Sequence, residues 1–149
     1  RQAGYDEAAI AAIAEAVRTS SWSRGLAPTA PLGALLQDAD RLDALGAIGL
    51  ARLFACGQHM SRPDRPGRFY DPADPAGRVR ALDDRRNAID HCAAKLLKLA
   101  DGMHFPTAQA EARRRHGVIE AFVAELLREV DIPEGSSGVR RPTSDVPQG

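Results

Sequence analysis

Two aspartates, Asp40 and Asp43, are the strongest candidates for chemistry in this sequence. They stand in the stretch 37–53, QDADRLDALGAIGLARL, which has three aspartates in its first seven positions. In a helix Asp40 and Asp43 lie one turn apart on one face, whereas Asp38 points elsewhere. Because carboxylate oxygens suit magnesium and manganese, the pair is a candidate contributor to a divalent metal site.

The surroundings of this pair leave two interpretations open. Acidic residues one turn apart also occur on solvated helix faces, or as ion-pair partners of basic neighbours such as Arg41 and Arg52. Gly46 and Gly49 favour a second interpretation, because each costs about 1 kcal/mol inside a helix and is usually accepted where another backbone packs closely. Aspartates beside such a helix are expected at the rim of a cavity, where a metal or an arginine offsets their desolvation.

The apolar periodicity of the chain predicts an all-α fold with about four main helices. The expected helices cover residues 6–18, 31–55, 79–100 and 107–130. Asp6 and Thr107 are the expected N-caps of the first and last helix. Between the second and third lies a connection rich in proline, glycine and arginine, residues 57–77, of a length typical of functional or flexible loops. No strand alternation, hairpin signature or internal repeat is present in the sequence.

The helical pattern predicts one domain followed by a tail. Residues 1–130 carry the pattern, whereas residues 131–149 have no apolar periodicity and are expected to be disordered. The chain starts with arginine, and a helical pattern begins almost at once. We therefore expect it to be part of a longer polypeptide, truncated on the N-terminal side.

Composition excludes several classes of function. The 149 residues are 44% hydrophobic, with no apolar run long enough to cross a bilayer. Basic and acidic residues number 20 each, so an extended nucleic-acid-binding surface is not indicated. Cys56 and Cys92 have no metal-type spacing, and two reduced thiols are typical of a cytoplasmic protein.

Several segments together resemble a known family. QDADRLDALGAIGLAR is similar to the last conserved segment of the HD-domain metal-dependent phosphohydrolases, and especially of a subgroup of small bacterial HD hydrolases. AVRTSSWSRGLAP resembles the segment that precedes it, and FYDPADP and AIDHCAAKLLKLADGM resemble the later loop and helix. The resemblance covers roughly residues 5–130 and implies a helical HD-domain-like bundle.

In that family a divalent metal is held by two histidines and two aspartates. The resemblance implies that Asp40 is the final metal-ligating aspartate, while the metal itself (Mn, Fe, Mg, Co or Ni) is not distinguished. The upstream histidine and the histidine–aspartate pair of the family are absent from this chain, and the Asp90–His91 order is the reverse of that pair. Ser20 stands where relatives tend to carry histidine.

The resemblance also implies a reaction and a set of site residues. Metal-bound hydroxide attacks phosphorus in a phosphate ester or anhydride, and a nucleotide is one candidate for this small phosphorylated substrate. Asp43 is the candidate for accepting or positioning a proton, with an ion pair to arginine as its alternative role. Arg18, His91 and Lys95 are the candidates for holding the phosphate, His91 and Lys95 because they share a helix face.

A second hypothesis comes from a different class of protein. The absent upstream ligands and Ser20 are also typical of a degenerate helical interaction module that kept the scaffold and lost catalysis. In either case this chain alone is expected to hold metal poorly and to be inactive, because a single aspartate falls short of the ligand number that such ions take.

Overall fold

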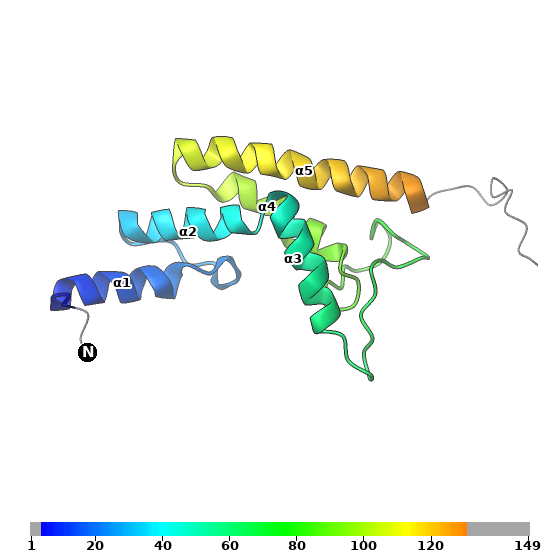
Figure 1. Cartoon of the computed structure of the whole chain (residues 1–149), viewed down its shortest axis with the longest axis horizontal. Coiled ribbons are helices and arrows are strands. Elements are labelled where there is room, and N and C mark those ends of the chain that lie inside the picture. Colours follow the sequence, from blue (N-terminus) through cyan, green and yellow to red (C-terminus); the bar gives the residue numbers. More distant parts are fainter. Residues whose placement is uncertain (1–3, 131–149) are drawn as a thin grey trace, which may run out of the picture.

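The computed structural model describes residues 4–130, and the regular structure in that part of the chain is helical (Figure 1). Its main helices are α1 (Glu7–Thr19), α2 (Pro31–Asp43), α3 (Gly46–His59) and α5 (Pro106–Val130). The shorter segments are η1 (Trp22–Arg24), the π-helical η2 (Cys92–Leu96), α4 (Leu97–Leu99) and η3 (Ala100–Gly102). The predicted all-α fold is confirmed, and the predicted tail lies outside the described residues.

Helix α1 agrees with its prediction at both ends. The Asp6 carboxylate caps it by accepting the Ala9 N–H at 2.7 Å. The helix packs beside α2, with Thr19 at its last turn buried between them. Its apolar stripe is nevertheless exposed: Ile10, Ile13 and Val17 all lie at the surface of the described part of the chain.

The predicted single helix over residues 31–55 is wrong, because the chain turns sharply between α2 and α3 (Figure 1). Gly46 has a φ of +76°, in the left-handed region that glycine adopts without strain. Leu45, just before it, is almost fully enclosed. Gly49 allows the first turn of α3 to approach the Ala44 carbonyl, where a side chain would overlap that oxygen. The glycines therefore mark a corner and a close backbone contact.

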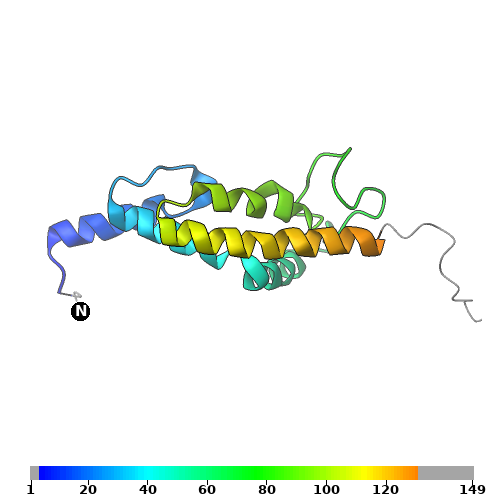
Figure 2. The same ribbon diagram turned by 90° about the horizontal axis from the view of Figure 1, so that it is seen from above.

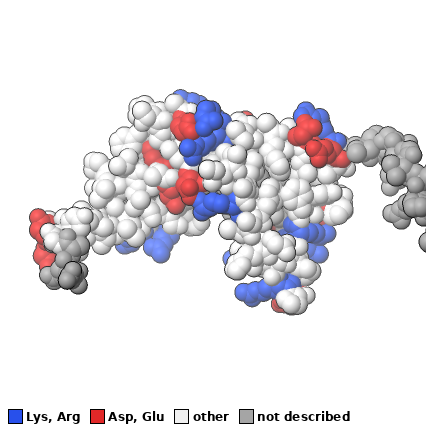
Figure 3. Space-filling model, viewed as in Figure 1, with Lys and Arg blue, Asp and Glu red and all other residues white. Residues whose placement is uncertain are grey.

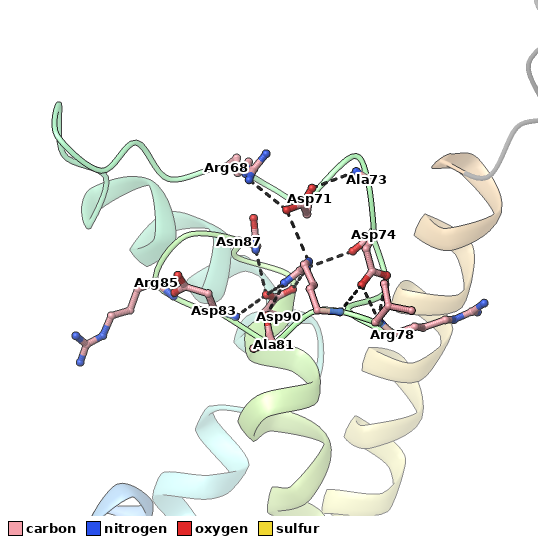
Figure 4. Close-up of polar contacts among 12 residues, drawn as sticks. Arg68, Asp71, Ala73, Asp74, Arg78, Ala81, Asp83, Arg85, Asn87 and Asp90 are labelled. Carbon is pink, nitrogen blue, oxygen red and sulfur yellow. Dashed lines mark hydrogen bonds and ion pairs between the residues drawn. The ribbon is translucent and has the colours of Figure 1, made fainter.

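The predicted helix over residues 79–100 is also wrong in its first half, because helical structure begins only at Asp90. A polar cluster holds the preceding residues as a loop (Figure 4). The buried Asp90 carboxylate accepts both terminal nitrogens of Arg80, at 2.6 and 2.7 Å, and the Asp83 N–H at 2.8 Å. The Asp74 carboxylate accepts the backbone N–H groups of residues 78–80. The bonds from the backbone N–H groups of residues 78–80 and 83 satisfy donors that a helix would otherwise pair.

The long helix α5 organises the core. It runs along the molecule and packs against α2, α3 and the helical run of residues 92–102 (Figure 2). The most enclosed apolar side chains are Leu45 in the corner between α2 and α3, Leu99 in α4 and Ile119 in α5. The predicted Thr107 cap is wrong, because α5 begins at Pro106 and Thr107 lies inside its first turn. Among the described helices, none is both long and apolar enough to span a membrane.

Candidate functional site

The aspartate motif on α2 is divided between the interior and the surface. Gln37, Asp38 and Arg41 are buried, whereas Asp40 and Asp43 are exposed. The buried members connect elements that are distant in sequence. The amide of Gln37 donates to the carbonyls of Thr19 and Leu26, at 2.7 and 2.9 Å, which attaches the loop after α1 to α2.

Asp38 and Arg41 attach α2 to the segment that leads into α5. The Asp38 carboxylate accepts the backbone N–H groups of His104 and Phe105 at 2.9 to 3.1 Å. The Arg41 guanidinium donates to the Gly102 carbonyl and stacks over Trp22, with its carbon 5.4 Å from the ring centroid. Burial lowers the pKa of Arg41, and the nearby aspartates oppose that shift.

Asp40, the predicted metal ligand, faces outward. Its side chain is exposed on the same side of α2 as Leu32 and Leu36, and its role as a metal ligand stays a prediction. Within residues 4–130 no group of three or more histidine, cysteine, aspartate or glutamate side chains is placed to hold a metal. The donors present here therefore do not form a metal site by themselves.

Asp43, the predicted proton acceptor, forms an ion pair with Arg52. Both side chains are exposed, and the pair bridges the end of α2 and the second turn of α3. Of the two roles left open by the sequence, this contact favours the ion pair. Arg52 also lines a pocket, so Asp43 orients one of the basic side chains of that pocket.

A pocket of about 360 Å³ lies between α3 and the start of the helical run that follows Asp90. Two of the predicted phosphate-binding residues, His91 and Lys95, line it together. Arg52 and Arg85 add two further cations to its wall, and Figure 3 shows basic side chains over α3 and the loop that follows it. The remaining wall is largely apolar and includes Leu53, Cys56, Met60, Ala88 and Leu96. An apolar floor with basic groups around it suits an organic phosphate.

Asp84 is the acidic member of this pocket. Its carboxylate Oδ2 lies 2.8 Å from the Nδ1 atom of His91. Sequence reasoning missed Asp84, Arg85 and Arg52 as pocket residues. It assigned residues 79–89 to a helix, and in a helix Asp84 and His91 would be two turns apart with no contact between them.

Arg18, the third predicted phosphate ligand, is elsewhere. It lies on α1, exposed, and its guanidinium is paired with the Glu15 carboxylate at 2.7 and 2.8 Å. It does not line the pocket that His91 and Lys95 share. The structure therefore brings two of the three predicted phosphate-binding residues together.

Comparisons with known proteins indicate the class of fold. The Bacillus subtilis protein YpgQ, itself uncharacterised, is 37% identical over 119 residues, which span 78% of this chain and 49% of YpgQ. An HD-superfamily hydrolase from Bacillus thuringiensis is 42% identical in its crystal structure, with a TM-score of 0.52 over 66% of this chain and 45% of that one. No family model matches the chain.

A third comparison covers more of the fold. The crystal structure of Bacillus subtilis YpgQ in complex with ADP has a TM-score of 0.63 and 28% identity, over 88% of this chain and 56% of that one. The described part of this chain thus has an HD-like helical fold. The chain spans about half the length of the curated relative that it matches.

Proposed function

We propose that this chain is the C-terminal part of an HD-superfamily metal-dependent phosphohydrolase acting on a phosphate ester or anhydride. The observation that carries the proposal is the basic pocket in which His91 and Lys95 meet. The likeness to an HD-superfamily hydrolase supports the reaction class. The ADP complex of YpgQ supports a nucleotide as one candidate substrate.

The pocket would bind the phosphorylated end of the substrate through its cations. Arg52 and Arg85 offer planar guanidinium groups that match phosphate oxygens in pairs, whereas Lys95 acts as a compact point charge. His91 adds a donor when its ring is protonated. A proton-accepting role for Asp43 remains a prediction, and its contact with Arg52 supports a positioning role.

The proposed metal would need ligands beyond those that residues 4–130 provide. Asp40 is one exposed carboxylate and falls short of any complete ligand set. It lies at the end of an apolar stripe on α2, formed by Leu32, Leu35 and Leu36, which is exposed in the described part of the chain. We propose that further polypeptide covers this stripe in the complete protein and brings the missing histidine and aspartate ligands to Asp40.

The test uses the complete polypeptide and compares metal content and phosphate release. We expect Asp40→Ala to lose most of the bound divalent metal, whereas Asp101→Ala, an exposed aspartate outside the pocket, keeps it. We expect Lys95→Gln to keep the metal and to lose phosphate release about tenfold or more, as one charged hydrogen bond disappears. Equal metal content in the wild type and the Asp40 variant would remove Asp40 from the site.

A second candidate function is a non-catalytic helical interaction module. The exposure of Asp40 and the lack of a metal-binding group within residues 4–130 favour it. A complete polypeptide that binds no divalent metal and releases no phosphate from nucleotides or sugar phosphates would select this candidate.

A further inference from the structure

The contact between Asp84 and His91 leaves one ring nitrogen for the pocket. Nδ1 of His91 is 2.8 Å from the Asp84 carboxylate, and Nε2 has no hydrogen-bond partner among residues 4–130. An ionised carboxylate only accepts hydrogen bonds, so in this contact Nδ1 carries the proton. Nε2 is then an acceptor in the neutral ring and a donor in the imidazolium ion.

The polar cluster of the preceding loop holds the two residues opposite each other. Asp83 and Asp90, the residues just before Asp84 and His91, are joined through the Asp83 N–H and the buried Asp90 carboxylate at 2.8 Å. The Asp83 carbonyl closes the turn by accepting the N–H groups of Arg86 and Asn87. Figure 4 shows the Arg85 side chain pointing away from this cluster. The cluster thus fixes the backbone on both sides of the contact.

We propose that Asp84 is a positioning residue that fixes the His91 proton on Nδ1 and directs Nε2 to a phosphoryl group bound in the pocket. The ligand part of this inference rests on the proposed function. The other charged or titratable groups that line the pocket are Arg52 and Cys56 on α3, Arg85 on the preceding turn and Lys95 on the helical segment of His91. The three cations attract the anion, and among the described residues that line the pocket Asp84 is the carboxylate that orients the ring.

The first measurement reads the tautomer directly. In ¹⁵N NMR spectra at alkaline pH, where imidazole rings are neutral, we expect the wild-type His91 proton on Nδ1. Asp84→Asn should keep it there, because the amide oxygen still accepts the bond. Asp84→Ala should populate both tautomers. A wild-type ring protonated on Nε2 would overturn the proposal.

The second measurement compares binding of inorganic pyrophosphate by calorimetry. Asp84→Asn and Asp84→Ala remove the same negative charge, so the electrostatic potential in the pocket changes equally in both variants. They differ in the amide group, whose oxygen can still accept a hydrogen bond from Nδ1, and the His91→Ala background controls for its size and its NH₂ donor. We expect the alanine variant to bind about tenfold more weakly than the asparagine variant, as one oriented charged hydrogen bond is lost. In a His91→Ala background this difference should vanish.

Asp101→Asn is the matched control for the loss of a carboxylate. It removes an exposed aspartate outside the pocket and should leave both the tautomer and the pyrophosphate affinity unchanged. Equal pyrophosphate affinity in the two Asp84 variants would overturn the role of Asp84. If the wild type itself binds no pyrophosphate, the proposed function fails at this pocket, and the tautomer measurement still decides whether Asp84 orients His91.

Discussion

Asp38 and Asp40 stand two positions apart in one helix, yet Asp38 is only 2% exposed and Asp40 faces solvent. The angle between adjacent helical positions accounts for this, since residues two apart point to nearly opposite sides. Asp38 accepts three hydrogen bonds from the backbone that leads into α5. Buried carboxylates require such partners, whereas exposed ones do not. The same residue type therefore has a structural role at one position and is available for a ligand at the other.

Replacing Asp38 should cost much more stability than replacing Asp40. Asp38→Ala leaves the backbone N–H groups of His104 and Phe105 without their acceptor, and we expect a loss of about 2–4 kcal/mol in the free energy of unfolding. Asp40→Ala should change it by less than about 0.5 kcal/mol. Urea unfolding of the two variants checks this, and similar losses in both would contradict the structural assignment.

At the scale of elements, the corner between α2 and α3 decides where the pocket forms. Gly46 turns the chain, and the side chain of Arg115 from α5 packs directly against it. Arg115 also donates to the Leu42 carbonyl at 2.7 Å, which satisfies the end of α2. The direction of α3, and with it the pocket wall, depends on these local contacts.

A side chain at Gly46 should destabilise the corner. Gly46→Ala places alanine at positive φ, at a cost of about 1–2 kcal/mol, and its Cβ would lie 3.2 Å from the Arg115 side chain. Gly117→Ala is the matched control, since nothing lies within 4 Å of that Cβ in the exposed middle of α5. We expect the control to stabilise the protein by about 0.5–1 kcal/mol. Thermal unfolding compares the two variants.

The contacts of α5 also predict a dependence of stability on pH. Hydrogen bonds from Arg114 and then Arg115 lower the pKa of Glu111 from its ordinary 4.5 to about 2. A folded-state pKa below the unfolded one contributes stability that is present above about pH 4.5 and is lost as the pH falls toward 2. We expect Glu111→Gln to reduce this loss in acid unfolding curves. Glu129→Gln, at an exposed position near the end of α5, should follow the wild type.

At the scale of the whole molecule, α1 and α2 both carry exposed apolar side chains, which together we call the apolar surface of these helices. They are Ile10, Ile13 and Val17 on α1 and Leu32, Leu35 and Leu36 on α2. Apolar side chains at helical spacing normally mark the buried face of a helix. In the proposed complete phosphohydrolase, the polypeptide that carries the missing metal ligands would cover this surface.

One pair of substitutions tests this surface in two contexts. Ile13 and Leu35 are 41% and 59% exposed here, so changing both to serine should alter the stability of this chain by less than about 1 kcal/mol. In the complete polypeptide we expect a loss of about 3 kcal/mol or more, because two apolar side chains would be buried there. Denaturant unfolding of both forms checks the difference. Equal effects in both would argue against coverage of this surface.

The presence and ends of several helices could be predicted from the sequence, because they depend on residues that are close together in the chain. The Asp6 cap, the apolar periods of α1 and α5 and the all-α class follow from capping chemistry and the helical repeat. The shared pocket of His91 and Lys95 also agrees with the sequence, because their spacing of four places them on one side of a helical segment.

Tertiary contacts decided the rest. The Gly46 corner, the loop held by Asp90 and Arg80, and the contact of Asp84 with His91 each depend on groups brought together by folding. The spacing of apolar residues in the sequence cannot distinguish a helix from a loop in which side chains form the hydrogen bonds of the backbone. From the motif alone, residue types and spacing named Asp40 and Asp43 as candidates. Only the long-range packing of α2 against the start of α5 decided which carboxylates are buried. The reason is that a carboxylate is stable in the interior only where backbone N–H groups donate hydrogen bonds to it.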